Sequence, residues 1–297
     1  MIKIVVQLTG GVGNQLFQYA TARALTLRCG GELVLDTWSG FVRDYQYRRQ
    51  YELDAFPLQS RPANALERVP FWLYRLENRI SPQPRTLFQR KIYGNFIVES
   101  QREYLSEIGK YQPASSCWMT GYWQSPKYFQ DYNSIILKEL TPPLPKNDKF
   151  IKLGAEMQQR PSVSLGIRLY EESNNPTGHA RDGKLKTPSD INGAIDSLIA
   201  QIPDPHFYVF CTHRSPLFSE LHLPANTTFV THDDGFEGAL ERLWLLSQCR
   251  HHLMTNSSFY WWGAWLSQMV YNQKEQIVLA ANNFINQDSL LPQWQQF

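Results

Sequence analysis

Short apolar segments alternate with helix-forming segments along most of this chain, and that alternation is the strongest constraint on its fold. The chain opens with an apolar run over residues 2–8, followed by the turn Gly10-Gly11-Val12-Gly13. A helix is predicted over residues 14–28 and a second strand over residues 32–36. Strand, glycine turn, helix and strand in this order begin a parallel α/β unit.

A proline-rich segment, residues 141–148, precedes a second region with the same alternation. Clustered prolines stop regular structure, so this segment is the best candidate for a linker. In the second region, strands are predicted over residues 163–168, 207–211, 228–231, 251–255 and 276–280, and helices over 150–159, 189–201, 238–247 and 260–269. Residues 36–141 are irregular and rich in aromatic residues and arginine. We therefore expect an α/β fold with domains at residues 1–145 and 146–297, each with a parallel sheet.

The composition excludes several classes of protein. Lysine and arginine number 29 against 27 aspartate and glutamate residues, a net charge of +2 that gives no support to a nucleic-acid partner. Cys29, Cys117, Cys211 and Cys249 are scattered without metal-ligand spacing, which favours free thiols in a reduced compartment. No apolar run approaches the ~18–20 residues that span a bilayer, so we expect a cytoplasmic protein. Residues 61–90 mix aromatics with cations, and we expect them to pack on their own domain, with peripheral membrane contact as the alternative.

A polar turn, Asn256-Ser257-Ser258, lies between an apolar run and an aromatic run. Short hydroxyl and amide side chains at a strand-to-helix turn, with free backbone N–H groups behind them, suit an anion and indicate a phosphate-bearing ligand. Helix capping is an alternative that uses the same N–H groups. Trp261, Trp262 and Trp265 have helical spacing, so we expect them in the core rather than against a substrate.

Four segments together resemble glycosyltransferase family 11, the bacterial α-1,2-fucosyltransferases. They are residues 10–15, 48–53, 121–129 and 245–266, and they spread over nearly the whole chain. The resemblance implies a GT-B-like architecture, with two Rossmann-like domains facing across a cleft. The first domain would carry the glycine-rich loop and the acceptor, and the second would bind the nucleotide-sugar.

The resemblance also implies the reaction. Fucose, a 6-deoxy-L-sugar, would pass with inversion from a GDP-sugar to a hydroxyl of a β-galactoside, forming an α-1,2 linkage. The acceptor would belong to a surface polysaccharide such as O-antigen, free or lipid-linked. No metal or other cofactor is expected, because the chain lacks an Asp-x-Asp motif, and the adjacent His251 and His252 would point to opposite faces of a strand.

The family motifs identify the donor-binding residues. Arg168 matches the first arginine of His-x-Arg-Arg-Gly-Asp-Tyr, which binds the pyrophosphate, and its guanidinium can neutralise the charge on the departing diphosphate. The serine pair of the polar turn matches the family's phosphate contacts, and the glycine turn matches a loop that lies against the donor. The expected donor-binding set is Gly11, Gly13, Asn14, Arg168, His213, Asn256, Ser257 and Ser258.

Two departures from the family bear on the donor. Gly166 replaces the histidine of the motif, and Phe210-Cys211-Thr212-His213 replaces a Phe-Ser-Asp-Asp segment. His213 or the pair Asp233-Asp234 is the candidate for the guanine contact that the lost acid would make. Losing polar groups suits a donor with one hydroxyl fewer, so GDP-colitose is an alternative donor. A non-catalytic sugar-binding member is the other alternative, which the retained Arg168 disfavours.

The catalytic residues expected are Arg168 and Glu171, with Glu171 as the base and Glu172 behind it. A solvated glutamate pair is the competing interpretation. The acceptor-binding residues are open, with Arg48, Tyr122 and Trp123 as candidates for stacking or hydrogen bonding.

Overall fold

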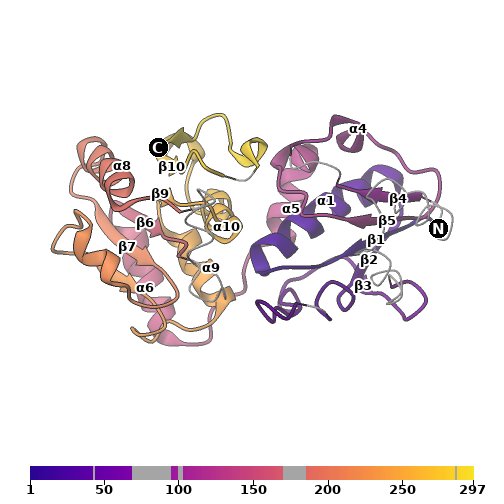
Figure 1. The fold of residues 1–297 in the computed structure, drawn as a ribbon, viewed down its shortest axis with the longest axis horizontal. Coiled ribbons are helices and arrows are strands. Elements are labelled where there is room, and N and C mark those ends of the chain that lie inside the picture. Colours follow the sequence, from indigo (N-terminus) through magenta and orange to yellow (C-terminus); the bar gives the residue numbers. More distant parts are fainter. Residues whose placement is uncertain (43, 69–94, 100–102, 170–184, 285) are drawn as a thin grey trace. The chain divides into compact units, whose positions relative to one another are not determined.

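The computed structural model describes residues 1–42, 44–68, 95–99, 103–169, 185–284 and 286–297. The chain divides into two compact units, Met1–Leu140 and Thr141–Phe297 (Figure 1). The division falls beside the proline-rich segment Thr141–Asp148, whose last residue begins a helix.

The first unit is built on a parallel sheet in the order β3-β2-β1-β5-β4. The strands are β1 (Lys3–Gln7), β2 (Glu32–Asp36), β3 (Arg61–Pro62), β4 (Asn95–Val98) and β5 (Cys117–Thr120). The helices described are α1 (Val12–Cys29), α4 (Ser106–Gly109) and α5 (Asn133–Glu139). The expectation that residues 36–141 are irregular was wrong, since three strands and two helices lie there. These strands have two to four residues and lie among aromatic residues and arginines, so the sequence shows no clear alternation there.

Helix α1 begins at Val12, two residues before the predicted start at Asn14. It is buried on most of its circumference. Two polar residues of this helix, Gln15 and Gln18, are fully buried. Each of these amides bonds to backbone of the loops around it, which explains how polar groups are tolerated there.

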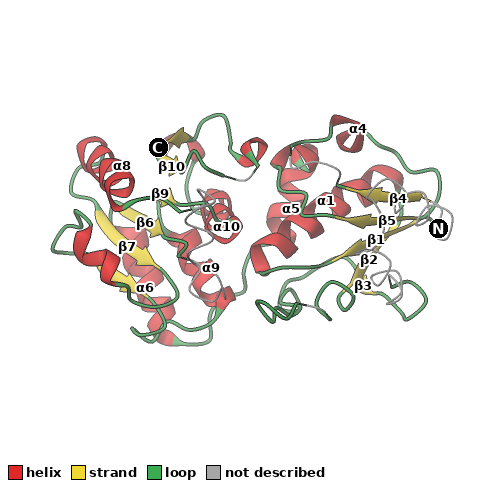
Figure 2. Ribbon diagram, viewed as in Figure 1, coloured by secondary structure: helices red, strands yellow, loops and turns green. Residues whose placement is uncertain are grey.

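The second unit holds a parallel sheet in the order β11-β10-β9-β6-β7-β8. Its strands are β6 (Ser162–Gly166), β7 (His206–Phe210), β8 (Thr228–Val230), β9 (His251–Met254), β10 (Val278–Ala280) and β11 (Gln295–Gln296). Its main helices are α6 (Asp148–Gln159), α8 (Pro188–Gln201), α9 (Ala239–Gln248) and α10 (Ser258–Leu266), shown with the strands in Figure 2. The predicted elements of this half are confirmed, with shifts of a few residues at their ends.

The central strand β6 is buried along its whole length, with different neighbours on its two faces. Val163 and Leu165 pack with α8, whose buried residues include Ile195. The alternate residues face the other way, where the ring of Tyr260 on α10 lies against Gly166. An aliphatic layer therefore covers one face, and an aromatic helix covers the other.

The aromatic run of α10 is core, as predicted for its tryptophans. Trp261 and Trp262 are fully buried, and Trp265 nearly so. Gly263 between them allows close helix packing, because a Cβ there would lie 2.5 Å from the Cβ of Leu246 on α9. Within the described part of the chain, no helix combines the length and the apolar character needed to cross a membrane.

Candidate functional site

The carboxyl edge of the second unit's sheet gathers most of the residues expected to bind the donor. Arg168 follows β6, His213 follows β7, and the segment 256–258 follows β9. Because β9, β6 and β7 are adjacent and parallel, their following loops lie at one edge, where ligands bind in open α/β sheets. The sequence placed Arg168 at the end of a strand, but β6 ends at Gly166 and Arg168 lies in the loop.

Thr255 ties the loop that holds Arg168 to the polar turn. The Arg168 backbone N–H donates to Thr255 Oγ1 at 2.7 Å, and Thr255 N donates to the Gly166 carbonyl at 2.9 Å. Thr255 directly precedes Asn256, so the predicted arginine and the predicted serine turn lie side by side. Thr255 was not among the expected site residues, although a hydroxyl residue ending a strand beside a polar turn was a usable signal.

The serine turn does not cap α10 in the way proposed as an alternative. Ser257 is the N-cap residue in an extended conformation, but its side chain accepts no hydrogen bond from the helix. Asn256 is buried, and its Nδ2 donates to the Asn283 carbonyl at 3.1 Å after β10. The Ser257 hydroxyl therefore does not cap α10, and it can accept or donate a hydrogen bond to a ligand.

Gly166, the most conspicuous departure from the family motif, has a structural cause. A Cβ on this residue would lie 2.4 Å from Cγ of Tyr260. The Tyr260 hydroxyl lies 3.0 Å from the carbonyl oxygens of both Ile167 and Phe210, and donates its proton between them. The tyrosine thus joins the ends of β6 and β7, and it occupies the space that a histidine at 166 would need.

The two candidates for the guanine contact form one cluster. His213 Nδ1 lies 2.9 Å from Asp233 Oδ1, and the backbone N–H of Arg214 donates to Asp233 Oδ2 at 2.7 Å. The hydrogen bond from His213, together with that N–H, lowers the pKa of the Asp233 carboxyl. Arg214 also pairs with Asp234, which the Thr231 hydroxyl contacts at 2.6 Å. The His213 and Asp233 side chains are both about half exposed and can meet a ligand.

In the first unit, the Gln15 side chain connects the glycine turn to residues 48–53, another of the segments that resemble the family. Gly10 has φ +75°, a conformation that favours glycine, and its carbonyl accepts from Gln15 Nε2 at 2.9 Å. The same nitrogen donates to the Gln50 carbonyl at 2.9 Å, while Gln15 Oε1 accepts from the Glu52 backbone N–H at 3.0 Å. One buried amide therefore organises both segments, and Gly11 and Gly13 lie between Gly10 and Gln15 in the chain.

The segment after β5 lies beside the same turn. Asn14 Oδ1 accepts from Gln124 Nε2 at 2.8 Å. The Glu99 carboxylate accepts the backbone N–H groups of Tyr122 at 2.7 Å and Trp123 at 2.9 Å. Trp123 has φ +55° and is completely buried, so the suggestion that it stacks on an acceptor was wrong. Tyr122, with 47% of its surface exposed, remains a candidate.

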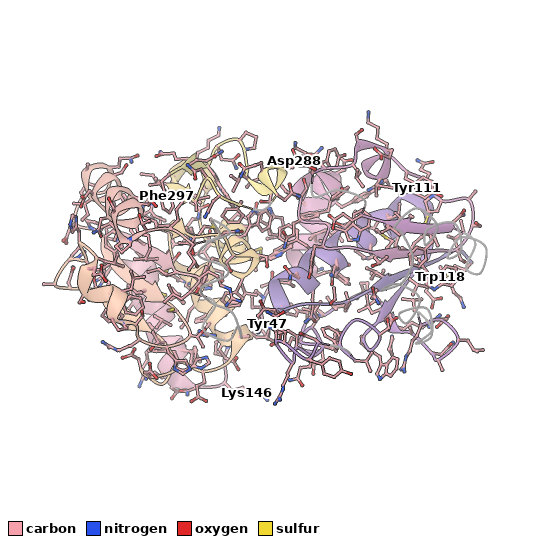
Figure 3. The ribbon with its side chains drawn as sticks, in the orientation of Figure 1. Tyr47, Tyr111, Trp118, Lys146, Asp288 and Phe297 are labelled. Atoms are coloured by element: carbon pink, nitrogen blue, oxygen red, sulfur yellow. The ribbon has the colours of Figure 1, made fainter. Side chains whose placement is uncertain are left out.

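One acidic side chain beside these loops, Glu52, was not among the expected site residues. Glu52 is half-buried, and burial raises the pKa of its carboxyl despite the nearby Arg49 and a hydrogen bond from the Val12 backbone. Figure 3 shows the ring of Tyr47, over which the Arg49 guanidinium lies at 5.5 Å from the ring centroid. Glu171 and Glu172, the candidate base and its neighbour, lie outside the described residues.

Two other expectations concern metal and membrane contact. Among the described residues, no group of three or more histidine, cysteine, aspartate or glutamate side chains is placed to hold a metal ion. His251 and His252 have separate protein partners, since His251 Nδ1 accepts from the Ile277 backbone and His252 contacts Ser164 and Ser267. Most of residues 61–90, the segment considered for membrane contact, lies outside the described residues.

Comparison with known proteins places these features in a family. The model of glycosyl transferase family 11 matches residues 1–296. Alpha-1,2-colitosyltransferase of Escherichia coli is 27% identical over 267 residues, covering 89% of this chain and 87% of that protein. O-antigen biosynthesis glycosyltransferase WbnK, also of Escherichia coli, is 25% identical over 272 residues, covering 88% of this chain and 89% of that protein.

A solved structure shares the fold. The crystal structure of NodZ alpha-1,6-fucosyltransferase soaked with GDP-fucose superposes with a TM-score of 0.50 at 15% identity, covering 90% of this chain and 93% of that one. The resemblance that the sequence motifs indicated is confirmed, as is the fold of two Rossmann-like units of the GT-B type. The chain belongs to glycosyl transferase family 11, and it is a fucosyltransferase-like glycosyltransferase.

Proposed function

We propose that this enzyme transfers fucose from GDP-fucose to a hydroxyl of a β-galactoside, with inversion and an α-1,2 linkage, during synthesis of a surface polysaccharide such as O-antigen. The observation that carries the proposal is the hydrogen bond between Arg168 N and Thr255 Oγ1, which brings an arginine beside the Asn256-Ser257-Ser258 turn. A guanidinium next to hydroxyl groups and helix N–H groups suits a diphosphate.

The diphosphate and the guanine of the donor each have proposed partners in this arrangement. Arg168 would bind the diphosphate and offset the charge that grows on it as the glycosidic bond breaks. The hydroxyls of Ser257 and Ser258 would bind phosphate oxygens. The exposed carboxylate of Asp233, oriented by His213, would accept hydrogen bonds from the N–H groups of guanine.

The first unit would contribute the glycine turn and the acceptor surface. Gly11 and Gly13 present backbone without side chains, so a ligand can approach closely. The Asn14 Oδ1 accepts a hydrogen bond from Gln124 Nε2, and this bond orients the amide of Asn14. We propose that the reaction needs no metal, since the arginine and the helix N–H groups supply the positive charge.

GDP-colitose is the second candidate donor, and two observations favour it. A relative of similar length is named alpha-1,2-colitosyltransferase. In addition, the ring of Tyr260 fills the place of a polar histidine side chain at Gly166, which removes a polar partner from the sheet edge. A site that loses a hydrogen-bonding side chain suits a sugar that lacks a hydroxyl.

A transfer assay decides between the donors. The purified enzyme is given GDP-fucose or GDP-colitose with a β-galactoside acceptor and a chelator, and the linkage of the product is determined by NMR. Greater kcat/KM with GDP-fucose and an α-1,2 product support the proposal. Greater kcat/KM with GDP-colitose would show that colitose, and not fucose, is the sugar transferred. A linkage other than α-1,2 would overturn the stated reaction. Loss of activity in the presence of the chelator would show that the enzyme needs a metal.

A further inference from the structure

The loop after β10 lies at the same edge of the second unit's sheet as the serine turn. Strand β10 pairs with β9, and just beyond this pairing the Ala281 backbone N–H donates to the Met254 carbonyl at 2.9 Å. Two residues later, the Asn283 carbonyl accepts from Nδ2 of Asn256 at 3.1 Å. The loop after β10 is therefore fastened to the turn that we propose binds phosphate.

Lys186 brings a cation to this loop from a distant part of the chain. Its Nζ donates to Asn282 Oδ1 at 2.9 Å and lies 5.1 Å from the centroid of the Phe297 ring, which is labelled in Figure 3. The Phe297 backbone N–H donates to the Ala280 carbonyl at 3.2 Å, and the Phe297 carbonyl accepts from the Asn282 backbone N–H at 2.9 Å. Lys186 is partly exposed, so two anchored neighbours hold its ammonium group where a ligand can reach it.

The stability of helix α8 does not explain this cation. Lys186 directly precedes Thr187, the N-cap residue of α8, which forms a capping box with Asp190. A positive charge before a helix is unfavourable, because the N-terminal end of the helix dipole is itself positive. The Asp190 carboxylate accepts from the Thr187 backbone N–H at 3.0 Å and from its hydroxyl at 2.8 Å. The helix is thus capped without Lys186, and a ligand at the sheet edge accounts for the cation better.

The order of the strands gives the direction in which the donor would lie. The residues proposed for guanine, His213 and Asp233, follow β7 and β8, whereas the residues proposed for the diphosphate follow β6 and β9. The sheet order β10-β9-β6-β7-β8 therefore puts the base at one end and the diphosphate in the middle. Neighbouring strands are about 4.8 Å apart, and the parts of a nucleotide-sugar follow in the order base, ribose, diphosphate and sugar. A donor bound in this order has its sugar at the loop after β10.

We propose that Lys186 binds a hydroxyl of the donor's sugar and that the loop after β10 forms the sugar subsite, an inference that rests on the proposed function. A lysine ammonium group has three N–H donors, and Asn282 takes one of them. The other donors suit the oxygens of sugar hydroxyls, and the exposed amide of Asn282 lies beside them. Lys186 is a binding residue in this account, which sets the affinity for the sugar and takes no part in proton transfer.

Calorimetric titration of the full chain with GDP and with GDP-fucose tests the sugar subsite. The variant Lys186→Met keeps the aliphatic part of the side chain and removes the ammonium group. Its affinity for GDP-fucose is expected to fall about tenfold or more, the usual contribution of a hydrogen bond from a charged donor. Its affinity for GDP should equal that of the wild type, because GDP lacks the transferred sugar. Lys152→Met, which removes an exposed cation from α6, is the matched control and should bind both ligands as the wild type does.

The GDP titration also separates the competing roles of Lys186. An equal loss of affinity for GDP and GDP-fucose in Lys186→Met would assign the residue to the diphosphate or to the fold, and would overturn the sugar subsite. Unchanged affinity for both ligands would leave Lys186 with only its contacts to Asn282 and Phe297, and would overturn it as well. In both cases the wild type still binds GDP-fucose, so the proposed function stands. If the wild type binds neither GDP nor GDP-fucose, the proposed function itself fails, and the inference fails with it.

Discussion

At the scale of single residues, one contact explains why this chain departs from its family's motif. Gly166 carries no side chain because the Tyr260 ring occupies that volume, and the tyrosine hydroxyl joins the carbonyls that follow β6 and β7. The sequence showed the glycine and the tyrosine separately, but not their contact, since they are far apart along the chain and meet only through the packing of α10 on the sheet. Thr255 was missed for a similar reason, because its partner is a backbone group of another loop.

Restoring the family's histidine should therefore destabilise the enzyme. Gly166→His is expected to lower the free energy of unfolding by about 1–3 kcal/mol, the usual cost of overpacking a core. Gly193→His is the control, because nothing lies within 4 Å of an added Cβ at that position on α8. Thermal unfolding of both variants measures the difference, and equal melting temperatures would contradict the account of Gly166.

Removing the Arg168 side chain should weaken the binding of the diphosphate in the transition state. Arg168→Ala is expected to reduce kcat by about 10²- to 10³-fold, because the charge on the leaving group would lose its proposed partner. Lys152→Ala, which removes an exposed cation from α6 in the same unit, should leave kcat unchanged. Transfer assays with saturating donor make the comparison, and unaltered kcat in Arg168→Ala would remove this residue from the catalytic group.

At the scale of secondary structure, the sequence was most informative where elements are long or apolar. The predicted strands and helices of the second unit are present, because apolar runs bounded by turns and helices of nine or more residues have clear patterns, even though β8, β9 and β10 have only three or four residues. In the first unit, β3 has two residues and β4 and β5 have four each, and these were not predicted. Their loops place Glu99, Tyr122 and Gln124, so the part of the site that they position could not be predicted either.

Helices α1 and α5 are joined by a buried ionic network that should matter for stability. Glu139 accepts from the Tyr19 hydroxyl at 2.7 Å and from two nitrogens of Arg23, the shortest at 2.8 Å. Because both ionic side chains are largely buried, Glu139→Gln leaves Arg23 without its counter-charge and should cost about 3 kcal/mol. Asp196→Asn, which breaks an exposed pair with His222, should have no measurable effect in the same urea titrations. Equal stability of the two variants would contradict the importance of the network.

At the scale of the whole molecule, buried histidines should make stability depend on pH. Burial lowers the pKa of His251 to about 4 and that of His252 to about 3, from an ordinary value of 6.5. The unfolded chain therefore binds these protons first, and the stabilisation, complete above pH 6.5, is lost as the pH falls toward the folded values. Between pH 6.5 and pH 5 the expected loss is about 2 kcal/mol for each histidine.

Urea unfolding at pH 7, 6 and 5 tests this expectation. Few carboxyl groups titrate in that range, so the slope of the free energy of unfolding against pH reports the buried histidines. His222→Gln, at an exposed position, should leave the slope unchanged. A free energy of unfolding that stays constant from pH 7 to pH 5 would show that His251 and His252 are not held neutral by burial.

The second unit is proposed to bind a guanosine diphosphate-sugar at the edge of its sheet, where the loop of Arg168 meets the serine turn. Calorimetric titration with GDP in the presence of a chelator tests it most directly, using the wild type, Arg168→Ala and Lys152→Ala. We expect micromolar binding by the wild type and by Lys152→Ala, and binding weakened at least about tenfold in Arg168→Ala, a loss of about 1.4 kcal/mol or more. Absence of GDP binding by the wild type, or equal affinity in Arg168→Ala, would contradict it.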